Sequence, residues 1–169
     1  MLWTLIPAAL WGGVLFRYDC RERRLPNWLT LGGAAVALAW RYGYGGSLFL
    51  VDGFVAATLG GLFLFVPYLM RGAGGGDVKM LAGAGAIVGT GGLLTLLLAT
   101  SLAGVVFGVA MLAAGKLDGA RLKHLGRCLF DWRYDRQAGK AGLPPKDSER
   151  TRIPFSLPIA LGTLAALAL

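Results

Sequence analysis

Six long apolar runs constrain the fold of this 169-residue chain more than any other feature. They cover residues 1–16, 28–40, 48–70, 78–90, 92–115 and 153–169. Crossing the hydrocarbon core of a bilayer takes about 20 apolar residues, with a range of roughly 17–25. Two runs reach that length outright, and the others reach it with flanking Gly, Tyr and Trp. We therefore predict an all-α, polytopic integral membrane protein with about six transmembrane helices in a single domain, 1–169. An alternative is that runs 78–90 and 92–115 form one hairpin with a tight turn at Gly89–Gly92.

The basic residues are sorted between these runs, and this predicts the topology. Residues 17–26, 71–79 and 116–152 contain 16 of the 17 Lys and Arg residues, and Arg41 lies elsewhere. Lys and Arg are enriched in the cytoplasmic loops of membrane proteins. We therefore expect a multi-pass protein of the cell inner (cytoplasmic) membrane with these three segments inside and both termini outside. The net charge of +8 then needs no nucleic-acid partner, and we expect none.

The composition agrees with a membrane protein. It is 56% hydrophobic and 15% charged, whereas soluble domains average about 45–50% apolar and about 25% charged residues. The first apolar run precedes the charged segment RYDCRERR. A cleavable signal peptide has the opposite order, with its positive charge first. We therefore expect the first run to be a membrane helix.

The segment 116–152 differs from the rest of the chain because it is polar and basic. We expect a cytoplasmic loop there. Its first part, 117–134, is either an amphipathic helix in the headgroup plane or an ordinary connector, and 135–152 has the composition of a flexible linker. Cys20 and Cys128 both fall on the predicted reducing side, so we expect no disulfide. The chain also lacks the Cys-x-x-Cys pairs of a structural zinc site.

The nine carboxylates differ in what their positions indicate. Five lie in the basic segment 116–152, where solvated pairing with Lys and Arg accounts for them. Glu22 lies among arginines and suits a surface ion pair. Asp52 lies near the outer end of its helix, facing water or a neighbouring helix. Asp19 ends the first predicted helix and Asp77 begins the fourth, so the topology places both at the cytoplasmic face.

Two interpretations of Asp19 and Asp77 remain open on the sequence alone. Two carboxylates brought together can share one proton, so that one is an acid and the other a base near neutral pH. Such a pair can activate water against an amide and protonate the leaving nitrogen. Alternatively, each residue marks a helix end. An Asp at a helix amino terminus is a common cap worth about 1 kcal/mol, which suits Asp77. Asp19 lies at a carboxyl end, where acidic groups are disfavoured.

Four glycines precede Asp77 in the stretch RGAGGGDVKM, residues 71–80. Glycine allows positive φ and close approach of another chain, so we expect irregular backbone there. An extended substrate could pair with such backbone by strand addition. A phosphate-binding loop needs Gly-x-x-x-x-Gly-Lys followed by Ser or Thr. Here Asp77 precedes the lysine and would repel phosphate, so we reject that interpretation.

Three stretches together resemble a known family. GGGDVK, residues 74–79, resembles the Gly-x-Gly-Asp signature of intramembrane aspartyl proteases, in the extended form found in type IV prepilin peptidases. DCRERRLPNWLT, residues 19–30, is similar to that family's first catalytic segment, with an Asp seven residues before a Pro. RIPFSLPIALG, residues 152–162, resembles its last-helix motif. The three stretches occur in the family's order.

The resemblance implies a specific activity. It implies that Asp19 and Asp77 are the catalytic pair and that the protein cleaves a short, basic leader from prepilin or pseudopilin precursors at the cytoplasmic membrane face. It also implies that proteolysis uses no metal and no cofactor. Further motif residues are expected to bind substrate or shape the site, and they are Gly74, Gly76, Lys79, Pro26 and Asn27. Arg23 and Arg24 are expected to shape the same loop.

The chain departs from the larger prepilin peptidases. These carry an amino-terminal cytoplasmic domain, often with four zinc-binding cysteines, which is associated with methylation of the new amino terminus. No such cysteines are present here, so we expect no methyltransferase activity. The short form is similar to the peptidases of tight-adherence (Flp-type) pilus systems and, less closely, to archaeal preflagellin peptidases.

Two other classes of function fit some of these features. One is a small ion-coupled transporter or channel, in which Asp19 and Asp77 bind a cation beside glycine-broken helices. Such proteins usually place their carboxylates near the midplane of the membrane, whereas the topology places these two near one face. The other is a non-catalytic scaffold of a pilus or secretion machine, against which the presence of both aspartates argues.

Overall fold

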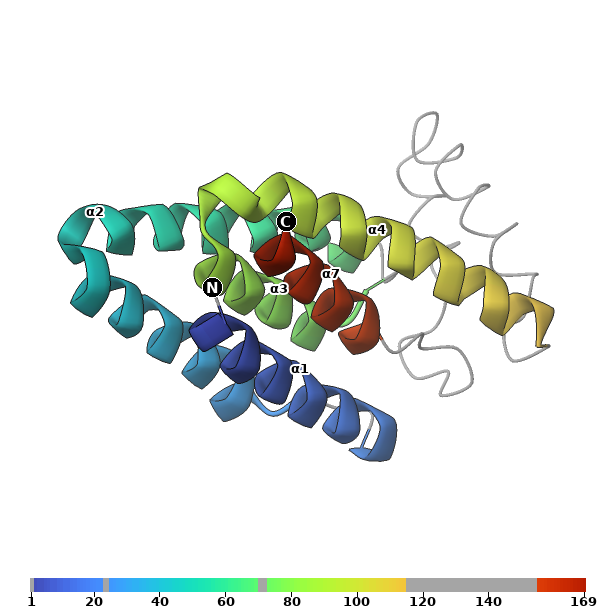
Figure 1. Ribbon diagram of the computed structural model, residues 1–169. Helices are drawn as coiled ribbons and strands as arrows, with labels where there is room; N and C mark the ends of the chain where they lie inside the picture. Colours follow the sequence, from blue (N-terminus) through green and yellow to red (C-terminus); the bar gives the residue numbers. More distant parts are fainter. Residues whose placement is uncertain (1, 23–24, 70–72, 115–154) are drawn as a thin grey trace.

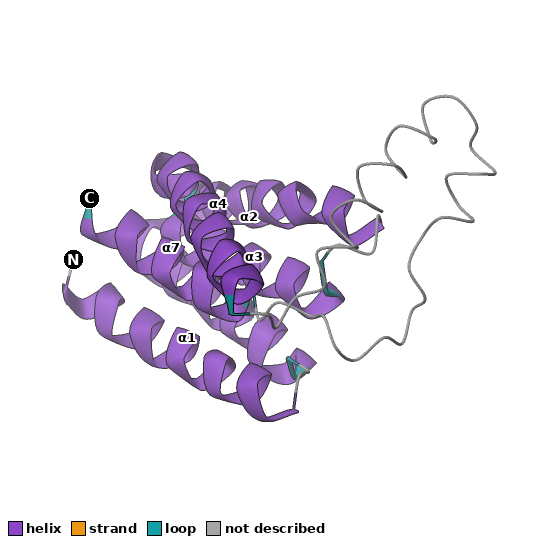
Figure 2. Ribbon diagram, turned by 90° about the vertical axis from the view of Figure 1, so that its right-hand side faces the viewer, coloured by secondary structure: helices purple, strands orange, loops and turns teal. Residues whose placement is uncertain are grey.

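The computed structural model describes residues 2–22, 25–69, 73–114 and 155–169, which form five helices and no strand (Figure 1, Figure 2). These are α1 (Leu2–Glu22), α2 (Asn27–Leu69), α3 (Gly75–Val88), α4 (Thr90–Ala113) and α7 (Ser156–Ala168). The described part of the chain confirms the all-α class. The segment predicted to be a basic loop, 116–152, lies outside the described residues, as do Arg23 and Arg24.

The helix α2 has two arms, because the chain reverses direction at Gly46 (Figure 1). Gly46 has φ 70° and ψ −158°, a backbone conformation that residues with a side chain rarely adopt. The arms, 27–45 and 47–69, contain the predicted runs 28–40 and 48–70. Helical structure therefore extends up to both sides of the turn, and the polar and aromatic residues between the two runs are helical rather than a loop.

The turn between α3 and α4 is shorter than predicted. The sequence suggested a turn over Gly89–Gly92, but only Gly89 leaves the helical conformation, with φ 80° and ψ 179°. The helix α4 begins at Thr90, so Gly91 and Gly92 belong to its first turn. Because a single glycine makes the reversal, α3 and α4 are two separate helices joined by a very tight connection.

The helix α3 lies inside the bundle and contacts α2, α4 and α7. Its small residues allow close approach: a Cβ added at Gly85 would lie 2.4 Å from the carbonyl oxygen of Ala56 in α2. The core has contributions from all five helices, and its buried members are Leu15, Leu64, Met80, Leu81, Ala84, Leu93, Leu96 and Ile159. Its position matters for function because Asp77 lies on α3.

The helices α1 and α7 lie side by side in both views, with the two chain termini near each other (Figure 1, Figure 2). The helix α1 packs mainly on α7 and much less on α2. A Cβ added at Gly12 would lie 2.9 Å from the Cβ of Ala160, which shows how closely the two helices approach. The position of α1, which carries Asp19, is therefore set largely by its packing on α7.

Large apolar side chains cover much of the outer surface of the bundle. Examples are Val36, which is 71% exposed, Leu48 at 81% and Leu102 at 68%. Among the described residues, two helices are long and apolar enough to cross a membrane, namely α2 and residues 90–111 of α4. Such an extensive apolar surface is typical of a protein that contacts lipid or other chains.

Candidate active site

Asp77 lies in the first turn of α3, and its side chain bonds back to the residue that caps that helix. Its Oδ2 accepts a hydrogen bond from the backbone N–H of Gly74, 3.0 Å away. In turn, its own N–H donates to the carbonyl oxygen of Gly74 at 3.1 Å. Asp77 was predicted to be the cap itself, but Gly74 is the N-cap, and Asp77 is the third residue of the helix and bonds back to it. Asp77 is also only 9% exposed, and a cap at a helix end does not require such burial.

The glycines before Asp77 do not adopt the backbone that the sequence suggested. Gly74 has φ −83° and ψ 148°, an ordinary extended conformation, and Gly75 and Gly76 are part of α3. The expectation of positive φ at Gly74–Gly76 is therefore wrong, and Gly72 lies outside the described residues. The glycines serve close packing instead. A Cβ at Gly76 would lie 2.9 Å from the Cβ of Leu25, and a Cβ at Gly74 would lie 2.9 Å from Asp77 Oδ2.

Asp19 lies in the last turn of α1, and its carboxylate contacts the start of α7. The hydroxyl of Ser156, the first residue of α7, donates a hydrogen bond to Asp19 Oδ2. Ser156 is fully buried. This serine lies within the stretch RIPFSLPIALG, and no role was predicted for it from the sequence. The sequence does contain a signal for this contact. A hydroxyl at the start of an apolar helix has no carbonyl one turn earlier in its own helix that could accept its hydrogen bond, so it needs a partner elsewhere.

The structure brings Asp19 and Asp77 to the same end of the bundle. Asp19 follows Leu15 by one turn of α1, and Asp77 precedes Met80 by one turn of α3. Leu15 and Met80 are both fully buried and belong to one core cluster together with Ile159 of α7. Residues one turn apart lie on the same face of a helix. Both carboxylates therefore lie one turn beyond the same core, at what we call the aspartate end.

Lys79, Asn27 and Pro26 meet beside this end. The ammonium group of Lys79 donates to Asn27 Oδ1 at 2.8 Å, which joins α3 to the first residue of α2. The carbonyl of Pro26 accepts the backbone N–H of Thr30 at 3.1 Å and so starts α2. Residues two apart on a helix do not face the same way, so Lys79 and Asp77 point to different sides of α3. These contacts give Lys79 and Asn27 a shared place next to the aspartates.

Trp11 fixes the rotation of α1 from the other side. Its indole N–H donates to the carbonyl oxygen of Leu29 in α2 at 2.9 Å. A Cβ at Gly33 would lie 2.1 Å from that indole nitrogen, so the glycine makes room for the ring. Trp11, Leu15 and Asp19 are spaced four residues apart and share one face of α1. Inserting the indole between the helices therefore turns Asp19 toward the bundle.

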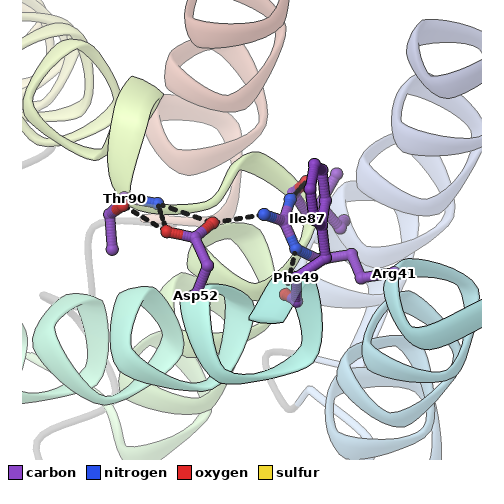
Figure 3. A network of polar contacts seen from close by, with 5 residues as sticks. All are labelled: Arg41, Phe49, Asp52, Ile87 and Thr90. Atoms are coloured by element: carbon purple, nitrogen blue, oxygen red, sulfur yellow. Dashed lines mark hydrogen bonds and ion pairs between the residues drawn. The ribbon is translucent and has the colours of Figure 1, made fainter. Parts of the chain in front are cut away.

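A second polar cluster lies at the opposite end of the bundle, where α2 turns and α3 meets α4 (Figure 1). Figure 3 shows its five residues, Arg41, Phe49, Asp52, Ile87 and Thr90. We call it the ion-pair end. The guanidinium of Arg41 forms an ion pair with Asp52 and donates to the carbonyl oxygens of Phe49 at 3.0 Å and Ile87 at 3.3 Å. Asp52 accepts the hydroxyl and, at 3.3 Å, the backbone N–H of Thr90. The sequence placed Asp52 facing water or a neighbouring helix, and it faces the neighbouring helix.

The ion pair joins the two tight turns of the bundle. Arg41 reaches a carbonyl at the carboxyl end of α3, and Asp52 reaches an N–H at the amino end of α4. A cation is favourable at the first position and an anion at the second, because each complements the helix dipole. Gly89, between the two helices, has no room for a side chain, since a Cβ would lie 2.5 Å from Asp52 Oδ2. The pair thus holds the Gly46 turn against the Gly89 turn.

Comparison with known protein families gives a match that covers both ends of the bundle. The type IV leader peptidase family matches the chain over residues 6–109, a stretch that begins in α1, includes both aspartates and the ion pair, and ends in α4. A search of curated proteins and a search of solved structures each found no match. The family match therefore covers more than half of the chain and agrees with the resemblance noted in the sequence.

Proposed function

Because the chain belongs to the type IV leader peptidase family, we propose that it is an aspartyl endopeptidase that removes the short leader from prepilin-like precursors. In this proposal Asp19 and Asp77 are the catalytic pair. The observation that supports it is that both carboxylates lie at one end of the bundle, each one turn beyond a shared core. A family of peptidases needs a catalytic group, and among the described residues these two carboxylates are the buried or half-buried acids at that end.

The proposed reaction uses the two carboxylates in different roles. One accepts a proton from a water molecule as the water oxygen attacks the carbonyl carbon of the scissile peptide bond. The other donates a proton to the nitrogen that leaves when the carbon–nitrogen bond breaks. Two neighbouring carboxyl groups that share one proton can supply both roles. The contacts to Gly74 and Ser156 hold the two side chains in place for this chemistry.

We further propose that the chain crosses the inner membrane with six helical segments. These are α1, the two arms of α2, α3, α4 and α7. The arms of α2 contain 19 and 23 residues, counted as 27–45 and 47–69, which is close to the length that spans a bilayer core, about 20 residues. The sorting of Lys and Arg supports placing the aspartate end at the cytoplasmic face. A leader peptide emerging from the membrane would meet Asp19 and Asp77 there.

We also propose that the substrates are prepilin or pseudopilin precursors, that proteolysis needs no metal or other cofactor, and that the protein has no methyltransferase activity. Gly74, Gly76, Lys79, Pro26 and Asn27 are proposed to shape the site. The transporter and scaffold alternatives have no comparable support, because the family match points to a peptidase.

The test is cleavage of a co-expressed pilin precursor from a neighbouring gene, followed by gel shift. Asp19→Asn and Asp77→Asn are compared with the parent at matched membrane abundance. Asparagine keeps the size of each side chain and can still accept a hydrogen bond, but it cannot exchange a proton. We expect each substitution to reduce cleavage by about 10²–10⁴-fold, the usual contribution of general acid–base catalysis.

Asp52→Asn is the matched control, since it changes a carboxylate in the same way at the ion-pair end. We expect it to retain cleavage per folded molecule. If either Asp19→Asn or Asp77→Asn cleaved at the parent rate, that residue would be removed from catalysis and the aspartyl mechanism would be wrong.

A further inference from the structure

The hydroxyl of Ser156 donates across the bundle, as does that of Thr90, the first residue of α4, which donates to Asp52. A hydroxyl inside a helix commonly donates to the carbonyl four residues earlier. Thr163 does so to Ile159 and Ser101 to Leu97, each at 2.7 Å. Ser156 is the first residue of α7, so no carbonyl of its own helix lies four residues before it. Its hydroxyl instead donates across the bundle to Asp19.

The burial of Ser156 makes this contact important. Ser156 is 0% exposed, and a buried hydroxyl without a partner would cost about 1–3 kcal/mol. Asp19 supplies the partner. A charge-assisted hydrogen bond of this kind is stronger and more directional than one between neutral groups. The serine therefore restricts how the Asp19 carboxylate can rotate, and the carboxylate in turn satisfies the serine.

The two aspartates are thus positioned by different elements. Asp77 is held by Gly74, three residues earlier on the same segment. Asp19 is held by Ser156, which is 137 residues away in sequence. The helix α1 packs mainly on α7, so α7 controls both the position of α1 and the orientation of its carboxylate. The amino end of α7 also carries the positive end of a helix dipole, which favours a carboxylate there.

We propose that Ser156 is a positioning residue for peptide cleavage. Its hydroxyl holds the Asp19 carboxylate in the orientation in which Asp19 and Asp77 act together on one peptide bond. This inference rests on the proposed function, because it requires Asp19 to take part in catalysis. It gives α7 a part in the reaction, although the matched region of the family ends at residue 109.

The expected effect follows from geometry. A misplacement of a reacting group by about 1 Å can cost about 10²-fold in rate. Removing the hydroxyl leaves Asp19 in place but frees its carboxylate to rotate. We therefore expect Ser156→Ala to lower kcat by about 10- to 100-fold with little change in KM, because no contact to the substrate is removed. Ser156→Thr keeps a hydroxyl at the same position and should restore most of the rate.

The experiment measures kcat and KM on a purified precursor that the detergent-solubilised parent cleaves. The variants are Ser156→Ala, Ser156→Thr, Asp19→Asn and Thr163→Val. The last is the matched control, because it also removes one buried hydroxyl from α7 without changing the size of the side chain, and Thr163 bonds only within its helix. Where threonine lowers the yield of folded protein, Ser156→Cys keeps a donor in nearly the same volume.

A second measurement does not depend on activity. The infrared difference between the parent and Asp19→Asn isolates the carboxylate band of Asp19. We expect that band to shift in Ser156→Ala, to return toward the parent position in Ser156→Thr, and to stay unchanged in Thr163→Val. If Ser156 only stabilised the fold, Ser156→Ala and Thr163→Val would both lower the melting temperature, and neither would move this band.

The outcomes separate the two proposals. If Asp19→Asn is inactive and Ser156→Ala cleaves like the parent, the role of Ser156 is refuted and the aspartyl mechanism stands. The role of Ser156 is also refuted, and the aspartyl mechanism stands, if Ser156→Ala and Thr163→Val lose equal activity with equal loss of folded protein. If Asp19→Asn itself cleaves normally, the proposed function fails at Asp19 and the inference fails with it. A loss of kcat confined to Ser156→Ala, with a shifted band, supports the inference.

Discussion

The two ends of the bundle use carboxylates in opposite ways. At the ion-pair end, Asp52 faces Arg41 and the start of α4, so its charge is matched and its oxygens are occupied by strong donors. At the aspartate end, Asp19 accepts a hydrogen bond from the hydroxyl of Ser156, and Asp77 accepts one from the backbone N–H of Gly74. The ion pair with Arg41 gives Asp52 a structural task, whereas the task proposed for Asp19 and Asp77 is catalysis. Carboxylates of one bundle thus differ in task, and for Asp52 the charged partner indicates that task.

The largest expected effect on stability comes from removing Arg41. Its side chain is 15% exposed and that of Asp52 is 32% exposed. Breaking a buried pair costs about 3–5 kcal/mol, and an exposed pair is worth about 0–1 kcal/mol. We therefore expect Arg41→Met to lower the free energy of unfolding by roughly 2–4 kcal/mol, because Asp52 and two carbonyl oxygens lose their donor. Denaturant unfolding in detergent micelles measures the change.

The same variant tests whether the two ends are independent. Per folded molecule, Arg41→Met should cleave a precursor at the parent rate, since the ion-pair end takes no part in the chemistry. The double variant Arg41→Met with Asp52→Asn should be more stable than Arg41→Met alone, because it removes the charge that was left unpaired. A large loss of kcat in well-folded Arg41→Met would show that the two ends are coupled. The ion-pair end would then contribute to catalysis as well as to stability.

The two ends can also be compared through single glycines, because Gly89 lies at the ion-pair end and Gly74 lies at the aspartate end. Gly89 has φ 80° and ψ 179°, a region that costs residues other than glycine about 1–3 kcal/mol. A Cβ there would also lie 2.5 Å from Asp52 Oδ2, so Gly89→Ala should lower stability by at least that amount. Gly74 has φ −83°, which alanine adopts freely, but its Cβ would lie 2.9 Å from Asp77 Oδ2. Gly74→Ala should therefore displace the carboxylate and lower kcat several-fold with little loss of stability. Cleavage kinetics and denaturant unfolding of both variants check this.

Gly13→Ala is the control for both glycine substitutions. Gly13 lies within α1, and a Cβ there would meet nothing within 4 Å. Alanine inside a helix is favoured over glycine by about 0.5–1 kcal/mol, so this variant should be slightly more stable and fully active. If Gly74→Ala lost stability as Gly89→Ala does, the glycines before Asp77 would serve the fold rather than the site.

The sequence predicted the helices well, because apolar length is a local property. Each predicted run corresponds to a helix or to an arm of α2. The sequence also identified Asp19 and Asp77, since their spacing to Pro26 and to the glycines is readable along the chain. On the residues themselves, the sorting of Lys and Arg was the reason to expect the two aspartates at the same membrane face. In the structure they do share one end of the bundle, although their catalytic role stays a prediction.

The contacts that the sequence missed are long-range ones. Ser156 meets Asp19 across 137 residues, and Arg41 reaches Ile87 across 46. No local pattern contains such pairings, because they depend on how the helices pack. The prediction for the glycines before Asp77 was wrong for a different reason. Glycine permits positive φ but does not require it, so the sequence could not tell a flexible loop from the close packing of Gly76 on Leu25.

The smallest expected effect concerns Lys79 and Asn27, which join α3 to α2 beside the aspartate end. Their hydrogen bond is 2.8 Å long but exposed, and such a bond contributes about 0.5–1.5 kcal/mol. Lys79→Met and Asn27→Ala should each lower stability by about that amount or less, and the double variant should lose little more than either single one. If the pair shapes the site, both single variants should also lower kcat by the same small factor, and the double variant should match them. Additive losses of activity would mean that Lys79 and Asn27 act separately, and then Lys79 would contact the substrate rather than hold α3 against α2.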